Sequence, residues 1–148
     1  MTSTTVRTLA ISCLVFLSVL RAPRADNPPE LPQPIEPAAK TLLKEGADAY
    51  DRGRAESNPD ARRAAFQDAI KAYMQGLAVE TKYHYTFYWN LGHAHRQLGE
   101  FTRADYWYKK FVEAAPPRYA VYKSAADDFQ RAMKAEIERS VREQEQLG

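Results

Sequence analysis

Cysteine is almost absent from this chain of 148 residues. The single cysteine, Cys13, lies within a short apolar run near the N-terminus, and no cysteine follows residue 25. The apolar run continues beyond Cys13 to Leu20, whereas a lipid-attached cysteine is expected to end such a run. A chain that is cleaved after Ala25 therefore has no disulfide and no thiolate chemistry.

The sequence also lacks the motifs of common catalytic and nucleotide-binding sites. It has no glycine-rich phosphate loop, no nucleophile elbow and no histidine pair at the i, i+4 spacing of helical metal sites. In a helix His93 and His95 point about 200° apart, and His84 lies about 16 Å from His95 along the axis. This geometry disfavours a metal-dependent enzyme built on the three histidines. We expect no catalytic residue, cofactor or metal, and we expect His95 to be a core residue.

An excess of one charge sign is missing as well. The chain has 21 lysines and arginines against 19 aspartates and glutamates. Arg7, Arg21 and Arg24 lie in the first 25 residues, which contain no acid, so the remaining chain carries one more acidic than basic residue. Binding to a phosphate backbone needs a concentrated positive face. Nucleic acid is therefore not an expected partner.

The first 25 residues have the pattern of a secretory signal peptide. A basic start at Arg7 precedes the apolar run LAISCLVFLSVL, and the segment ends on Ala25. The run of 12 residues rises about 18 Å as a helix, less than the roughly 30 Å of a hydrocarbon core. Pro23 and Arg24 are unusual before a cleavage site, so an uncleaved N-terminal anchor, the one expected route to membrane contact, stays open. Export to a bacterial periplasm or cell envelope is the first expectation, and secretion is the second.

Proline is concentrated in one place. Residues 26–37, DNPPELPQPIEP, contain five of the nine prolines of the chain. Proline fixes φ and removes the amide donor, so this segment is predicted to be an extended spacer rather than part of a core. Such a spacer is expected to hold the following module away from the N-terminal segment.

The sequence after Pro37 predicts helices only. Apolar residues recur at helical spacing, and alternation of period two is limited to a brief stretch around KYHYTFY. Asn58 and Pro59 form a helix start, while Gly53, Gly99 and Pro116 follow helix ends. The predicted helices are therefore approximately 38–53, 59–80, 84–98, 102–115 and 119–146. We predict an all-α fold of antiparallel helix hairpins.

The third and fourth predicted helices share a specific spacing of small and aromatic residues. Along the chain these residues are Tyr88, Leu91, Gly92, His95, Ala104, Tyr108, Phe111 and Pro116. The spacing resembles the tetratricopeptide repeat (TPR), a helix–turn–helix unit of about 34 residues, and here the unit spans 85–118. The resemblance implies a short solenoid of two hairpins over 38–118, the first of them degenerate and longer in its turn and second helix. Residues 119–148 then resemble a capping helix.

The TPR resemblance also implies a binding surface. In such repeats the face that carries Trp89, His93 and Arg96 lines a concave groove, in which aromatic and arginine side chains recognise peptides. Packing of Trp89 against the second helix is an equally open alternative. Only Asn90 matches the carboxylate-clamping set known in the family, so that activity is not expected. The candidate partner-binding residues are Tyr85, Trp89, Asn90, His93, Arg96, Lys123 and Asp127.

Two functions follow from these observations. The first is a non-catalytic interaction module, a scaffold or adaptor of the cell envelope, that binds a peptide or helical segment of another protein in the concave groove. The second starts from the C-terminal helix, whose charged surface carries a narrow apolar stripe that needs cover. On that reading the protein is a structural envelope protein that forms homo-oligomers through this helix. The stripe consists of Phe129, Met133, Ile137 and Val141.

Overall fold

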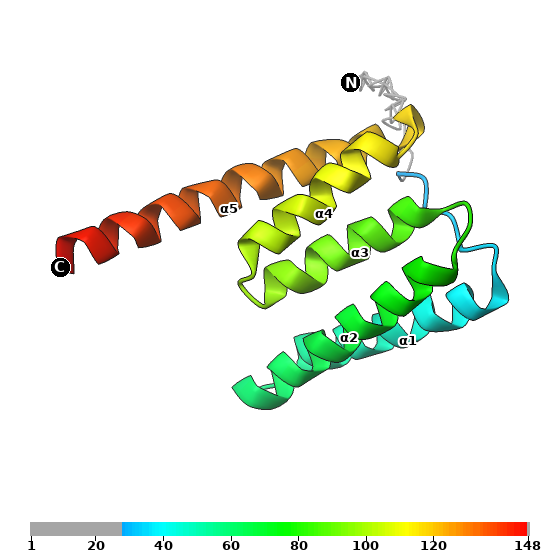
Figure 1. Ribbon diagram of the computed structural model, residues 1–148, viewed down its shortest axis with the longest axis horizontal. Helices are drawn as coiled ribbons and strands as arrows, with labels where there is room; N and C mark the ends of the chain where they lie inside the picture. The colour runs from blue at the N-terminus through cyan, green and yellow to red at the C-terminus, as the bar shows by residue number, and fades with distance from the viewer. Residues whose placement is uncertain (1–27, 148) are drawn as a thin grey trace, which may run out of the picture.

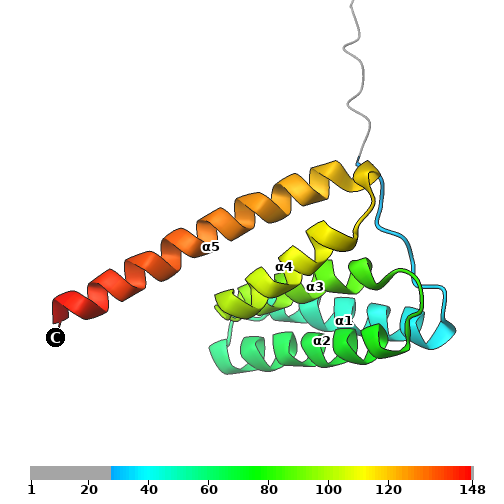
Figure 2. The same cartoon turned by 45° about the horizontal axis from the view of Figure 1, so that its top comes forward.

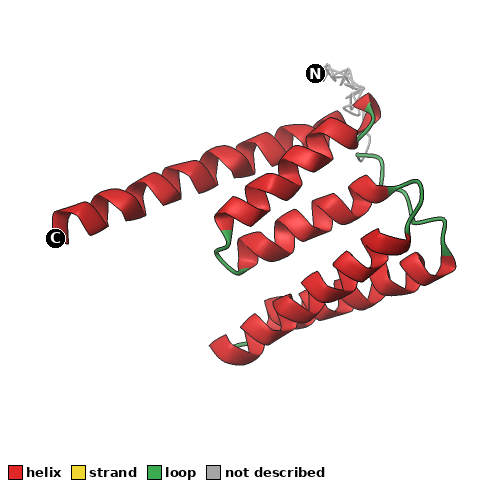
Figure 3. Ribbon diagram, viewed as in Figure 1, coloured by secondary structure: helices red, strands yellow, loops and turns green. Residues whose placement is uncertain are grey.

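A computed structural model describes residues 28–147 of the chain. Within this range all regular structure is helical, as Figure 3 shows, and the predicted all-α class is confirmed. The predicted helix bounds agree with the structure to within about two residues. In order, the elements are α1 (Pro37–Ala55), α2 (Pro59–Val79), α3 (His84–Gln97), α4 (Phe101–Ala114), the 3₁₀ turn η1 (Pro117–Tyr119) and α5 (Ala120–Leu147).

The predicted signal peptide, Cys13 included, lies outside the described residues. Among residues 28–147 no helix is both long enough and apolar enough to span a bilayer.

Helices α1 and α2 form the first hairpin. The Asn58 side chain caps α2 by accepting hydrogen bonds from the amides of Asp60 and Ala61, both at 3.0 Å, and Pro59 occupies the first turn. The two helices can approach closely because Gly46 lies against the ring of Tyr73. A Cβ atom at Gly46 would stand 2.3 Å from that ring, so only glycine fits this crossing.

Helices α3 and α4 form the second hairpin and use the same device. Gly92 faces the ring of Tyr108, with only 2.7 Å available to a Cβ atom. Gly99 adopts a φ of 72° in the connecting turn, a conformation that favours glycine. The turn is closed by His95, whose Nδ1 lies 2.5 Å from a carboxylate oxygen of Glu100. His95 is buried, as predicted, and its partner Glu100 is half-buried.

The hairpins stack side by side, and α5 continues the stack next to α4 (Figures 1 and 2). One core cluster joins α1, α2 and α3 around Tyr73, Phe87 and Leu91. A second cluster joins α3, α4 and α5 around Tyr108, Phe111 and Tyr119. With 28 residues, α5 is about 42 Å long, twice the length of α4 with its 14 residues. Its C-terminal half therefore runs on past the end of α4 (Figure 1).

The prediction that the proline-rich segment stands apart from the core is wrong for residues 31–36, which we call the N-terminal strap. Pro34 is fully buried, and Leu31 lies against the second core cluster. The Thr86 hydroxyl donates a hydrogen bond of 2.9 Å to the Pro32 carbonyl. The extended backbone thus finds partners on the hairpins, because a proline segment without internal hydrogen bonds leaves its carbonyls available.

Glu80 fixes the strap to the connection between α2 and α3. Its buried carboxylate accepts hydrogen bonds from the amides of Ile35, Lys82 and Tyr83 at 3.1, 2.9 and 3.0 Å. Burial opposes ionisation of this carboxyl, but the backbone hydrogen bonds outweigh it and hold the pKa of Glu80 below its usual value. A charged carboxylate therefore joins the strap to the two hairpins.

Candidate functional site

The centre of the predicted groove is occupied by side chains of the chain itself. Trp89 projects from α3 into a cluster of rings, with its centroid 5.1 Å from that of Tyr122 and 6.3 Å from that of Phe129. Tyr122 and Phe129 both belong to α5. The structure therefore differs from the expected open groove at this point, and also from packing of Trp89 against α2. The TPR spacing concerns the α3–α4 hairpin alone and does not say what lies over the Trp89 face of α3. In the structure α5 covers this face.

His93 is held in the same cluster in its neutral form. Burial, and secondarily the charge of Arg96, lowers the pKa of His93 to about 4. The His93 Nδ1 lies 3.1 Å from the Tyr108 hydroxyl and 3.4 Å from an Arg96 nitrogen. Because arginine can only donate, Nδ1 is the acceptor and the ring proton resides on Nε2. His93 thus supplies a hydrogen-bond acceptor between α3 and α4.

Arg96 lies at the edge of this cluster. Its guanidinium stacks over the ring of Phe129, with 4.0 Å between the Cζ atom and the ring centroid. Its Nε is buried and has no hydrogen-bond partner among residues 28–147. Arg96 therefore helps to hold α5 against α3 instead of projecting into an open groove.

The other candidate residues separate into two groups. Tyr85 is buried against Phe111 and Tyr119, and the Asn90 amide donates to the Thr86 carbonyl within α3 at 2.8 Å, so both have structural contacts where partner contacts were predicted. Lys123 and Asp127 lie on α5, half-buried and exposed respectively. The structure brings Trp89, His93 and Arg96 together but leaves Asp127 on a different surface.

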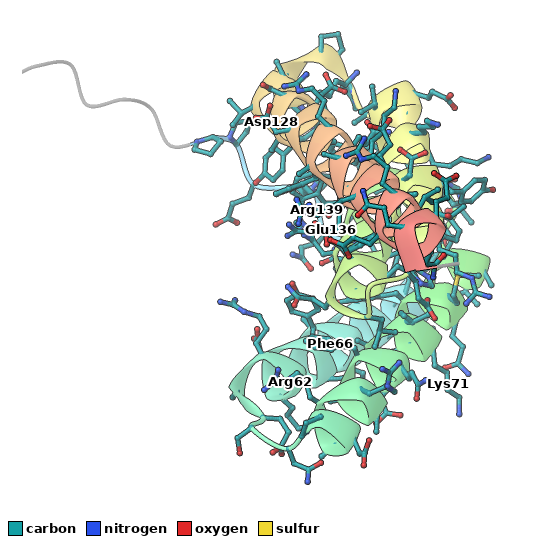
Figure 4. All side chains as sticks on the ribbon, turned by 90° about the vertical axis from the view of Figure 1, so that its left-hand side faces the viewer. Arg62, Phe66, Lys71, Asp128, Glu136 and Arg139 are labelled. Atoms are coloured by element: carbon teal, nitrogen blue, oxygen red, sulfur yellow. The ribbon has the colours of Figure 1, made fainter. Side chains whose placement is uncertain are left out.

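Asp127 lines an open groove between α4 and α5 of about 670 Å³, which we call the α4–α5 groove. Phe101 of α4 and Met133 and Ile137 of α5 supply its apolar lining. Asp128, Glu136 and Arg139 lie on the side of α5 turned away from α4 (Figure 4). The charged and polar lining residues are Thr102, Asp105, Lys109, Asp127, Gln130, Arg131, Lys134 and Glu138.

The polar rim of the α4–α5 groove is partly fixed by ion pairs. The Asp105 carboxylate lies 2.7 Å from the Lys109 ammonium and accepts a hydrogen bond of 2.8 Å from the Gln130 amide. Burial acts against ionisation of Asp105, but the bonds from Lys109 and Gln130 keep its pKa below the usual value. Within the described chain Asp127 has no cation at ion-pair distance. This carboxylate is available to a cationic group of a ligand.

The described residues contain no group of three histidine, cysteine, aspartate or glutamate side chains placed to hold a metal ion. The α4–α5 groove is lined by both apolar and charged side chains.

The sequence identified part of this site. The stripe of Phe129, Met133, Ile137 and Val141 requires cover, and the structure covers part of it. Phe129 and Met133 pack in the second core cluster, while Met133 and Ile137 line the α4–α5 groove. Phe101 was not identified, because the TPR spacing begins its second helix just after this residue.

Comparison of the chain with protein-family models, with curated proteins and with solved structures finds no match.

Proposed function

We propose that this protein is a non-catalytic, TPR-like interaction module that binds a helical segment of another protein in the α4–α5 groove. The observation that carries the proposal is the position of this groove at the open end of a helix stack. Each helix of the stack packs against the next one in the chain, and among residues 28–147 no helix follows α5. The α4–α5 groove is where a sixth helix of the same stack would lie.

The TPR-like character is supported by the repeated crossing device. Gly46 and Tyr73 in the first hairpin correspond to Gly92 and Tyr108 in the second, each glycine lying under a tyrosine ring. Helix α2 contacts both α1 and α3, and α4 in the same way contacts both α3 and α5. Helix α5 thus stands to α4 as α3 stands to α2. On this proposal a partner helix takes the position beside α4 and α5 that no helix among residues 28–147 occupies.

The groove favours an amphipathic helix. Phe101 and Met133 provide an apolar lining for large aliphatic or aromatic side chains, which usually anchor a helix in a groove. Lys134 and Glu138, 4.0 Å apart, form a loose pair on the rim that a partner can exchange for its own charges. The unpaired Asp127 favours a lysine or arginine at one end of the partner helix.

Site-specific photo-crosslinking tests this proposal in cells. A photo-reactive residue at Lys134 lies in the groove, whereas the same residue at Arg139 lies on the opposite face of the same helix and serves as the matched control. We expect a discrete crosslinked protein from position 134 alone, identified by mass spectrometry. Equal products from both positions, or none from 134 at any expression level, would contradict the proposal.

A second function, self-association through α5, is favoured by one observation. Val141 is 46% exposed on the half of α5 that extends past α4. Size exclusion with light scattering on the chain from residue 26 decides between the two. A monomer for the wild type and for Ile137→Asp supports the interaction module. A dimer that dissociates in Ile137→Asp and Val141→Asp supports self-association.

We propose in addition that the protein is exported, as residues 1–25 suggest. Cell fractionation followed by mass spectrometry of the N-terminal peptide tests this. Cleavage is supported if the protein outside the cytoplasm begins at Asp26. An uncleaved anchor is supported if the protein in the membrane fraction still contains the N-terminal peptide with Arg7.

A further inference from the structure

A second groove lies between α2 and α4, on a different face of α4 from the α4–α5 groove. One hollow of about 450 Å³ is lined by Ile70, Met74 and Trp107 among others, and a smaller one of about 220 Å³ adjoins it. Both hollows share Ile70, His95 and Arg103, so they form one continuous surface. We call this surface the α2–α4 groove.

The aromatic side chains of the α2–α4 groove are exposed but held in place. Tyr106 is 51% exposed and Met74 is 43% exposed, although both are large apolar residues. Trp107 stacks on Tyr88, with ring centroids 5.8 Å apart and an interplanar angle of 24°, and meets the edge of Tyr106 at 4.9 Å. Rigid tyrosine and tryptophan rings supply contact area at low entropic cost, and they are enriched with methionine and arginine at protein interfaces.

Basic side chains flank this apolar surface. Lys71 lies on the α2 side, Arg103 on the α4 side, and the Lys110 ammonium lies 5.6 Å from the centre of the Tyr106 ring. Across residues 28–147 neither Lys71 nor Lys110 has a carboxylate within ion-pair distance.

The acidic residue that lines the groove is Glu100, and its carboxylate is already engaged. It lies 2.5 Å from His95 Nδ1 and 3.4 Å from an Arg103 nitrogen. The unpaired charges beside this groove, those of Lys71 and Lys110, are therefore positive, and the Arg103–Glu100 pair lies next to them.

We propose that the α2–α4 groove binds an acidic peptide segment of another protein that carries a large apolar side chain. The apolar side chain contacts Met74, Tyr106 and Trp107, and its acidic neighbours pair with Lys71, Arg103 and Lys110. Such a site combines a buried anchor with a charged rim, the arrangement that gives short peptides both affinity and selectivity. Nucleic acid and anionic lipid fit less well, because they require a wider positive face than these three side chains provide.

Fluorescence anisotropy with the full-length protein tests the proposal. The probe is a short fluorescein-labelled peptide in which a phenylalanine and a leucine are flanked by glutamates. One control peptide replaces the two apolar residues by alanine, and another replaces the glutamates by lysines. We expect the probe to bind and each control peptide to bind at least about tenfold more weakly.

Protein variants locate the binding. Tyr106→Ala and Lys110→Glu are each expected to weaken binding of the probe by roughly tenfold, because an interface anchor or a paired charge is lost. Lys134→Glu changes the α4–α5 groove and is the matched control, with unchanged binding expected. Circular dichroism checks folding, and Lys110→Glu decides the matter if Tyr106→Ala does not fold.

Three results would overturn the proposal. The first is equal binding of the alanine-substituted peptide, which would show that charge alone suffices. The second is tighter binding of phosphatidylserine vesicles or of a single-stranded oligonucleotide than of the probe. The third is a loss of probe binding in Lys134→Glu but not in Lys110→Glu, which would place the peptide in the α4–α5 groove instead. None of these three results depends on whether a partner helix binds in the α4–α5 groove, so the two proposals can fail independently.

Discussion

The ring of Tyr73 covers Gly46 so closely that a Cβ atom on this glycine would lie 2.3 Å from the tyrosine Cε1. Tyr73 is almost completely buried and cannot move aside into solvent. The close approach of α1 and α2 therefore depends on the hydrogen atom that glycine has in place of a side chain.

Replacement of Gly46 by alanine is expected to destabilise the protein by about 1–3 kcal/mol, the usual cost of overpacking a core. Helix propensity alone predicts the opposite sign, a gain of about 0.5–1 kcal/mol. Urea denaturation followed by circular dichroism distinguishes the two. A stabilised Gly46→Ala variant would show that the hairpin adjusts and that the close approach is not required.

Trp89→Ala is expected to destabilise the protein by about 3–5 kcal/mol, because the variant removes a large ring from the contact of α3 with α5. Near-ultraviolet circular dichroism and thermal unfolding measure the loss. Tyr106→Ala is the matched aromatic control on an exposed position, and a change of less than about 1 kcal/mol is expected there. Equal stability of both variants would contradict the packing role of Trp89.

His93 makes stability depend on pH. Its folded pKa of about 4 lies below the usual value of 6.5, so the unfolded chain takes up the proton more readily. The free energy of unfolding therefore has its full value with respect to His93 above pH 6.5. It decreases as the pH falls toward 4, by up to about 3 kcal/mol in total.

The measurement compares the unfolding free energy at pH 7 and at pH 4.5 for the wild type and for His93→Gln. The variant, which cannot titrate here, is expected to lose less stability on acidification than the wild type. Arg96 and Tyr108, which face His93, remain in both proteins and cancel in the comparison. An identical pH dependence of the two proteins would mean that His93 is solvated when folded.

Glu80→Gln is expected to loosen the N-terminal strap at a cost of about 1–3 kcal/mol, since hydrogen bonds to a charged acceptor are replaced by weaker ones. The folded pKa of Glu80 is lowered, so its stabilisation is present above the usual pKa range of a glutamate and is lost as the pH falls below it.

Hydrogen exchange checks the strap directly. The Ile35 amide is expected to exchange faster in Glu80→Gln, while amides in the middle of α2 keep their protection. Unchanged exchange at Ile35 would show that burial of Pro34 alone holds the strap.

The helices were predictable because their ends carry strong local signals. Asn58 caps α2 as expected, Gly99 takes the left-handed conformation that ends α3, and Pro116 follows α4. The small residues at the crossings were also recognisable, since Gly92 fell within a known spacing. These features depend on residues close together in the chain, where sequence patterns are most informative.

The strap and the covered groove were not predictable for the converse reason. Proline content indicates an extended backbone, but Pro34 is buried through contacts with residues far along the chain. The environment of Trp89 depends on where Tyr122 and Phe129 lie, and therefore on the orientation in which α5 packs against α3. A pattern of period 3.6 gives the direction of each side chain on its own helix but not the angle between helices.

The strap has a mechanical consequence. The backbone enters the helical body at the end where α5 begins, while the C-terminus of α5 points the other way (Figure 1). A pull on the N-terminal side of the strap acts on the hairpins through the hydrogen bonds of Pro32 and Ile35. A force applied at residue 28 therefore reaches the helical body at the end of the stack where α5 begins, away from the C-terminus of α5.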